Sequence, residues 1–342
     1  MIPDAAPDEM ARELGQGPEA VESTLREVRR QRSELDALIA RAERIVLVGT
    51  GASLAVARAA APLWRARIGR DLLVRQSSEI ALGELDGDRM RASDLLIALS
   101  QSGTSPETLA AVRLATEAGA AVLAITAHAE APLAARAVMT VAVQSGEEHG
   151  AATKSALATL AALFAVGGVL ALDHGEAAGL ARRLRTVVAS GGDRAAAAGP
   201  LISARRTWFV GFGVGLGLAQ AGALLWHEKV VRQAMATTPS ELRHGPIEAL
   251  GAGDAVVLID VDQRESGREA YLDLLRSELA ELGARLVELP RAAGGEPATR
   301  ALTALLQAQQ LAHATAIAAG TYRDGFAVLR HIVTAADRLF AP

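Results

Sequence analysis

A dense group of small hydrogen-bonding side chains occupies residues 100–105, SQSGTS. The members are four hydroxyl residues, one amide and one glycine: Ser100, Gln101, Ser102, Gly103, Thr104 and Ser105. An apolar run typical of a buried strand precedes them, and a helix is predicted from Pro106, with Ser105 as its N-cap. Free N–H groups at a helix start attract an anion, and glycine lets the backbone approach it. The stretch therefore predicts a lysine-free phosphate site, as against an ordinary polar loop with a capping serine.

A second loop of this kind is GTGAS, residues 49–53, which also follows an apolar run. Gly51 and Ser53 are its candidate phosphate ligands. A dinucleotide-binding fingerprint would need a third glycine at position 54, where the sequence has Leu54. The loop therefore argues against a nicotinamide cofactor, and we expect no cofactor of any kind.

Two acid–base candidates lie between residues 222 and 246. Glu228 falls on a predicted helix, and His244 falls in the turn SELRHGP. Glutamate can remove a proton from carbon, and histidine can move one at oxygen. The alternative is an exposed helical glutamate and a histidine that fixes a turn. GEEHG, residues 146–150, could suggest a metal cluster, but its residues are consecutive in a loop, so we interpret them as solvated charge and expect no metal.

Composition limits the classes of protein. The 342 residues suggest about two domains, and an aromatic share of 3% requires a core of Ala, Leu and Val. The net charge of −4 and the lack of a basic block argue against a nucleic-acid partner. The absence of cysteine excludes disulfides and fits a cytoplasmic location. The uncharged stretch 155–172 is at the short limit for a membrane span, so a buried helix and no membrane partner are expected.

Short apolar strands alternate with helices, which predicts an α/β fold with a parallel sheet covered on both faces. The pattern then restarts, because residues 44–57 align with residues 206–219 at an offset of 162. The chain is therefore predicted to be duplicated. The expected domains are a helical segment at 1–42, a first domain at 43–195 and a second at 196–342, which ends in a helix and tail.

Together these stretches resemble the sugar isomerase (SIS) family. More narrowly, they are similar to the isomerase half of glucosamine-6-phosphate synthase and to stand-alone SIS-type glucosamine-6-phosphate deaminases. The matching stretches are GTGAS (49–53), SQSGTSPETLAA (100–111), GEEHGAATKSALATL (146–160), GFGVGLGLAQAGALLWHE (211–228) and ELRHGP (241–246).

The resemblance implies two tandem SIS domains, each with a parallel five-stranded sheet flanked by helices on both faces. It implies that Ser53 and the 100–105 stretch bind a sugar phosphate and that Ala152, Thr153 and Lys154 line the sugar. It further implies that Glu228 moves a proton between C1 and C2. His244 would open the sugar ring from the neighbouring subunit, which implies a homodimer.

The sequence departs from the family pattern in one helix and in the tail. Ala221 and Leu225 stand where the family has glutamate and lysine, and residues 328–334 contain no lysine, with Arg330 or His331 in its place. Arginine stays protonated and cannot form an imine. We expect a hexose 6-phosphate isomerase or deaminase that converts glucosamine 6-phosphate to fructose 6-phosphate and ammonia. The alternatives are a fructosamine-6-phosphate-type deglycase, with room at C1 beside Ala221 and Leu225, and a non-catalytic phosphosugar sensor.

Overall fold

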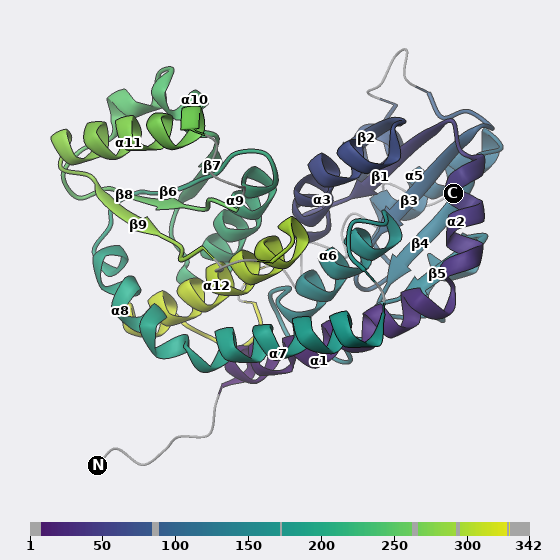
Figure 1. Cartoon of the computed structure of the whole chain (residues 1–342), viewed down its shortest axis with the longest axis horizontal. Coiled ribbons are helices and arrows are strands. Elements are labelled where there is room, and N and C mark those ends of the chain that lie inside the picture. The colour runs from purple at the N-terminus through teal and green to yellow at the C-terminus, as the bar shows by residue number, and fades with distance from the viewer. Residues whose placement is uncertain are drawn as a thin grey trace. The chain divides into compact units, whose positions relative to one another are not determined.

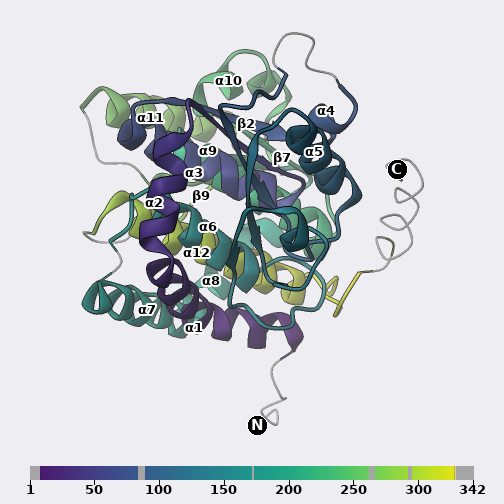
Figure 2. The ribbon, with the colours of Figure 1, turned by 90° about the vertical axis from the view of Figure 1, so that its right-hand side faces the viewer.

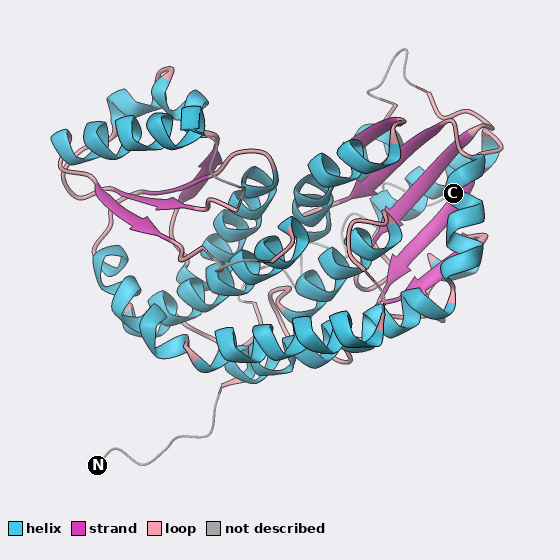
Figure 3. Cartoon of the chain, viewed as in Figure 1, coloured by secondary structure: helices cyan, strands magenta, loops and turns pink. Residues whose placement is uncertain are grey.

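The computed structural model describes residues 8–83, 89–171, 173–261, 266–291, 295–326 and 328. They form two compact units, each built around one parallel sheet (Figure 3). The five-strand unit comprises the described residues of Gly17–Glu147, Lys154–Ala181 and Phe326–Pro342. The four-strand unit comprises those of Met1–Gln16, Glu148–Thr153 and Arg182–Gly325.

The five-strand unit confirms the parallel α/β sheet predicted for the first half. Its strands are β1 (Arg44–Gly49), β2 (Asp71–Gln76), β3 (Asp94–Leu99), β4 (Ala121–Thr126) and β5 (Met139–Ala142), in the order β2-β1-β3-β4-β5. β1 and β3 are central and buried along their whole length, as expected for strands covered on both faces. In this order β1 lies between β2 and β3, so later strands are added to the sheet on both sides of β1.

Helices cover this sheet in two layers. They are α3 (Ala52–Ile68), α4 (Ser77–Ala81), α5 (Pro106–Glu117) and α6 (Lys154–Val166). α3 packs on α6, and α4 lies beside α5 (Figure 2). The Trp64 indole N–H donates to the Leu163 carbonyl at 2.8 Å. A Cβ at Gly167 would lie 2.3 Å from the Trp64 ring, so glycine is required there.

The apolar stretch considered as a membrane span forms the buried helix α6, which ends at Val166 rather than near 172. Every residue of α6 is buried against other parts of the protein. Within the part of the chain that the structure describes, no helix has both the length and the apolarity needed to cross a bilayer.

The four-strand unit contains β6 (Thr207–Val210), β7 (Ala234–Thr237), β8 (Ala255–Leu258) and β9 (Arg285–Glu288), in the order β7-β6-β8-β9. Its helices are α8 (Gly191–Ile202), α9 (Val214–Leu225), α10 (Pro239–Arg243), α11 (Ser266–Glu281) and α12 (Pro297–Ala318). Figure 1 shows α11 over one face of the sheet, with α9 and α12 on the other. The long helices α1 (Glu9–Arg30) and α7 (His174–Ala189) each contribute residues to both units, and α2 (Arg32–Arg41) belongs to the five-strand unit.

The prediction of five strands in each half is wrong for the second half, whose described residues form four. After β9 the chain reaches α12 within residues 289–296, which include Pro290. A further parallel strand would need a crossover of about a dozen residues or more. The chain has too little length there to return to the sheet edge.

The two sheets nevertheless share one topology. The order β7-β6-β8-β9 repeats β2-β1-β3-β4. Gly51 and Gly213, 162 positions apart, both precede a helix with nearly the same backbone angles, φ 59° and ψ −128° against φ 49° and ψ −114°. Left-handed φ values of this kind favour glycine. The repeat found in the sequence therefore has a counterpart in the backbone.

Candidate functional site

Two loops leave the same edge of the five-stranded sheet. Residues 49–53, the glycine loop, follow β1, and residues 100–105, the hydroxyl loop, follow β3. β1 and β3 are neighbours, and the strand order reverses between them. Open α/β sheets bind ligands in the crevice at such a switch point. The structure therefore brings the two predicted phosphate loops to one edge, in front of the first turns of α3 and α5.

The hydroxyl loop is folded onto itself by its own side chains. The Ser100 hydroxyl accepts from the Gly103 N–H at 3.1 Å and lies 3.0 Å from the Ser105 hydroxyl. The Ser102 hydroxyl accepts from the Thr104 N–H and hydroxyl at 3.3 and 3.0 Å. The loop is thus a closed turn whose hydroxyl groups are held in fixed positions.

Gly103 is required by the shape of this turn. Its φ is +65°, and a Cβ there would lie 2.4 Å from the Ala131 Cβ and 2.9 Å from the Thr126 hydroxyl. The backbone of the loop is also tied to the strand beside it, because the Gln101 carbonyl accepts from the Ala127 N–H at 3.0 Å. Side chain and backbone contacts together leave this turn little freedom.

Ser105 is the N-cap residue of α5, as predicted, but its side chain makes no capping hydrogen bond. Among the described residues no side chain caps this helix, because the Ser105 hydroxyl is paired with Ser100 instead. α3 begins in the same way at Gly51, which has no side chain to cap it. Both first turns therefore direct uncapped N–H groups toward the switch point, where they can bind an anion.

The segment predicted to line a sugar, residues 152–154, is largely buried. Lys154 begins α6 and is 4% exposed, while Thr153 is buried and Ala152 half-buried. The Thr153 N–H and hydroxyl donate to Glu148 Oε1 at 2.9 and 3.0 Å. The interpretation of residues 146–150 as solvated charge is therefore wrong for Glu148, a half-buried carboxylate that accepts two hydrogen bonds from Thr153.

Glu228 lies in a π-helical turn, Trp226–Val230, that extends α9. We call this segment the π-turn. Such turns are rare and occur often at functional sites. Val231 follows it with φ 56°, the one positive φ outside glycine in the described residues. A β-branched residue is strained in that conformation, and retained strain of this kind clusters at functional sites.

The carboxyl group of Glu228 is poised to exchange protons near neutral pH. Burial raises its pKa to about 7, the Lys229 ammonium acts in the opposite direction, and the Glu148 carboxylate raises it further. A general base works best when its pKa lies near the working pH. His227, the preceding residue, is exposed, and its Nε2 accepts from the Ala234 N–H at 2.9 Å.

Close packing of α9 on β6 fixes the position of the π-turn. A Cβ at Gly222 would lie 2.8 Å from the Phe209 ring, so the helix can approach this strand only with glycine there. Phe209 and Trp226 then meet edge to face, with ring centroids 5.5 Å apart. Ala221 is half-buried and Leu225 is buried on the same helix.

His244 is presented outward. It directly follows α10, which is capped by Thr238, whose hydroxyl accepts from the Glu241 N–H at 3.1 Å. The His244 side chain is exposed, and Gly245 follows with φ 125°. The donation of His244 to a neighbouring subunit stays a prediction. Arg330 and His331, the candidates to replace a tail lysine, lie outside the described residues.

The sequence did not reveal the roles of Lys229 and Glu148, whose charges act in opposite directions on the pKa of Glu228. The sequence offers one signal for Lys229, because two apolar residues, Val230 and Val231, follow it directly. Lys229 is only 1% exposed. Burial of an ammonium group costs free energy unless the group is paired, so a buried lysine indicates a specific role.

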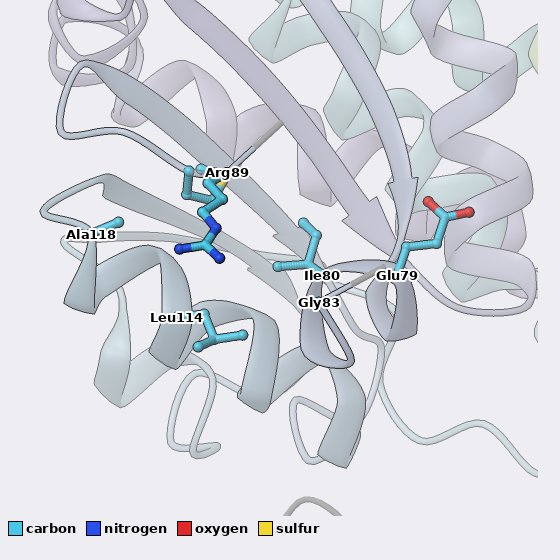
Figure 4. Close-up of a pocket in the computed structure, with 7 residues that line it drawn as sticks. Glu79, Ile80, Gly83, Arg89, Leu114 and Ala118 are labelled. Carbon is cyan, nitrogen blue, oxygen red and sulfur yellow. The ribbon is translucent and has the colours of Figure 1, made fainter. Parts of the chain in front are cut away.

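A separate cavity of about 330 Å³ lies between α4 and α5 in the five-strand unit. Its lining is mainly apolar, with Ile80, Met90 and Leu114, and Figure 4 shows the Glu79 carboxylate pointing away from Arg89 and Leu114. Leu114 lies near the C-terminal end of α5, whereas the hydroxyl loop precedes its N-terminal end, and a helix of 12 residues is about 18 Å long. The cavity is therefore distinct from the candidate phosphate site.

Comparison with known proteins finds one matching family and several similar sequences. Residues 38–166 match the SIS domain family. The chain is 28% identical over 289 residues to glutamine–fructose-6-phosphate aminotransferase [isomerizing] of Sulfolobus acidocaldarius, covering 82% of this chain and 46% of the relative. The chain thus spans about half the length of the curated relatives it matches.

Two solved structures share the fold at low sequence identity. Tagatose-6-phosphate ketose/aldose isomerase from Escherichia coli superposes with a TM-score of 0.81 at 22% identity, covering 92% of this chain and 95% of the other. Glucosamine-6-phosphate deaminase from Thermotoga maritima superposes with a TM-score of 0.71 at 19% identity, covering 92% and 97%.

Proposed function

We propose that this chain, whose residues 38–166 match the SIS domain family, is a phosphosugar isomerase or deaminase that moves a proton between C1 and C2 of a hexose 6-phosphate. The proposed reaction converts glucosamine 6-phosphate to fructose 6-phosphate and ammonia. The observation that carries the proposal is the half-buried Glu228 carboxyl, which burial holds at a pKa of about 7 in the π-turn that precedes the strained Val231. The choice of substrate is supported by the structural neighbour named glucosamine-6-phosphate deaminase, and the choice of product by the relative named for fructose 6-phosphate.

The phosphate is assigned to the switch point of the five-stranded sheet. Ser53 and the hydroxyl loop would donate from side chains, and the first turns of α3 and α5 would donate from the backbone. The hydroxyl loop is already closed on itself by the contact between Ser100 and Ser105. Phosphate binding would then contribute orientation of the sugar rather than chemistry.

The chemistry is assigned to Glu228 and His244. His244 assists ring opening by moving a proton at the ring oxygen. Glu228 removes the proton at C2, and the electrons of the C2–H bond form the C1=C2 double bond of an enolamine. The electrons of the C1=O π bond move to O1, which takes up a proton from solvent. Return of the proton to C1 leaves an imine at C2. Water adds to that carbon, the C–N bond breaks, and ammonia leaves with the ketose as the other product.

The proposal extends to the assembly. The four-strand unit is proposed to be a second SIS domain, supported by the repeated strand order and by the matching backbone at Gly51 and Gly213. A homodimer in which His244 serves the neighbouring subunit is proposed from the family resemblance, and the outward position of His244 supports it.

A second candidate is deglycation of a sugar–amine adduct such as a fructosamine 6-phosphate. The observation that favours it lies in α9, where half-buried Ala221 and buried Leu225 replace two charged residues of the family. Side chains that are shorter or uncharged would leave room for a substituent at C1 of the sugar. A phosphosugar sensor without catalysis is the remaining alternative.

The test is to incubate the purified protein with glucosamine 6-phosphate and to measure ammonia and fructose 6-phosphate. The matched control is Glu228→Gln, which keeps the shape but cannot accept the proton. We expect both products from the wild type and none from the variant, with phosphosugar binding retained in a thermal-shift assay. Turnover of fructosamine 6-phosphate alone would favour the deglycase. Binding across hexose phosphates without any turnover would favour the sensor.

A further inference from the structure

Lys229 is a buried cation beside the candidate base. It is 1% exposed and belongs to the π-turn, directly after Glu228. An ammonium group taken out of water must be hydrogen-bonded or paired, or it loses its proton. The hydrogen-bond partners of the Lys229 ammonium and the charges near it therefore indicate its role.

The segment 321–325 wraps around Lys229. The ammonium Nζ donates to the carbonyl oxygens of Arg323 and Gly325, at 3.1 Å each, and lies 5.5 Å from the centre of the Tyr322 ring. In the other direction, the Thr321 hydroxyl donates to the Lys229 carbonyl at 3.3 Å. Lys229 thus contacts four of the five residues 321–325 and holds this segment against the turn that carries Glu228.

The segment that carries Glu148 passes the same ammonium. A Cβ added at Gly150 would lie 3.1 Å from Lys229 Nζ and 3.1 Å from the Gly325 Cα. Gly150 has φ +93°, so glycine is favoured there on two grounds. Three stretches of chain, the π-turn, residues 148–153 and residues 321–325, therefore meet around one positive charge within the four-strand unit.

The charges around this group act in opposite directions on Glu228. The Lys229 ammonium lowers the pKa of Glu228, against burial and the Glu148 carboxylate, which raise it. Burial also lowers the pKa of Lys229, and the carboxylates that oppose this are Glu228, Asp324, Glu13 and Glu9. Of the groups acting on Glu228, Lys229 is the cation that favours the ionised, proton-accepting form.

We propose that Lys229 is a positioning residue, whose buried ammonium fastens residues 321–325 against the π-turn and keeps Glu228 ionised enough to act as a base. The functional consequence rests on the proposed function, but the electrostatic link between the two residues does not. It can be measured without substrate.

The experiment is a pH titration of the Glu228 side chain by NMR on protein labelled with ¹³C at the glutamate carboxyl groups. The Glu228 resonance is identified by its loss in Glu228→Gln. Lys229→Met and Lys229→Gln remove the charge and shorten the side chain by only one atom. In both we expect the Glu228 midpoint to move from about 7 to higher pH by about one unit or more.

Thr321→Val is the matched control, because it removes a contact between the same two segments and leaves the ammonium in place. Its Glu228 midpoint should not move. Hydrogen exchange of the amides at 321 and 322, which donate to the Ala316 carbonyl, should become at least tenfold faster in the neutral Lys229 variants.

Faster exchange with an unchanged Glu228 midpoint would assign Lys229 a purely structural role and overturn the proposal. Failure of both neutral variants to fold would do the same. If the wild type turns over no phosphosugar but the midpoint moves as expected, the proposed function fails while the role of Lys229 in setting the charge of Glu228 stands.

Discussion

Glu228 obtains its acid–base character from its surroundings rather than from its residue type. An ordinary glutamate is fully ionised at neutral pH, whereas burial raises the pKa of Glu228 to about 7, with Lys229 and Glu148 acting in opposite directions. The sequence could nominate Glu228 through its place in a motif. It could not show the π-turn, because the hydrogen-bond pattern of a helix end depends on tertiary contacts, such as the one between Trp226 and Phe209.

This environment predicts the pH dependence of the reaction. The base must be ionised, so kcat/KM should rise with pH and level off above about 7, and should fall about tenfold per pH unit below that value. The measurement is kcat/KM from pH 5 to 9. Glu117→Gln, an exposed carboxylate on α5, serves as the control and should leave the profile unchanged. A flat profile across pH 7 would remove Glu228 from the role of base.

At the scale of elements, much of the five-strand unit was predictable, because continuous apolar runs such as β3 report burial on both faces. The number of strands in the second half was not. It followed from the family resemblance, whereas the short segment between β9 and α12 leaves no room for a crossover. The pairing of Ser105 with Ser100 was equally inaccessible, since a serine can cap a helix or bind a neighbour with the same side chain.

The hydroxyl loop provides a test at this scale. Gly103→Ala introduces a Cβ 2.4 Å from the Ala131 Cβ, which must displace the loop. We expect KM for the phosphosugar to rise at least tenfold, equivalent to about 1.4 kcal/mol of binding. Gly69→Ala is the control, because its φ of +56° carries similar backbone strain but nothing lies within 4 Å of the added Cβ.

The comparison of these two variants separates strain from displacement. Both should lose stability, by roughly 1–3 kcal/mol for a side chain held at positive φ. Only the Gly103 variant should lose phosphosugar affinity, as measured by steady-state kinetics and thermal shift. An unchanged KM in a folded Gly103→Ala protein would place the phosphate elsewhere.

At the scale of the whole molecule, the chain carries one topology twice but distributes its candidate groups unequally. The switch point of the five-strand unit carries the hydroxyl residues, and the four-strand unit carries Glu228 and His244. The duplication was visible in the sequence because glycines such as Gly51 and Gly213 are needed for the same backbone turn. Assembly was not visible, because outward side chains such as His244 are compatible with solvent or with a partner.

Complementation between subunits tests the proposed dimer. Glu228→Gln and His244→Ala chains should each be inactive alone. If His244 serves the neighbouring subunit, a mixed dimer contains one intact site, so random mixing should restore about a quarter of wild-type activity. The measurement is the specific activity of co-expressed chains against each variant alone. No recovery in a verified mixed dimer would place both residues of one site in one subunit.

The most direct test of the central claim, that Glu228 moves a proton between C2 and C1 of a phosphosugar, is the reaction in D₂O followed by NMR. We predict that the wild type places deuterium at C1 of fructose 6-phosphate, and that Glu228→Gln slows this incorporation by about 10²–10⁴-fold while still binding the sugar phosphate. Deuterium incorporation by Glu228→Gln at the wild-type rate would contradict the account.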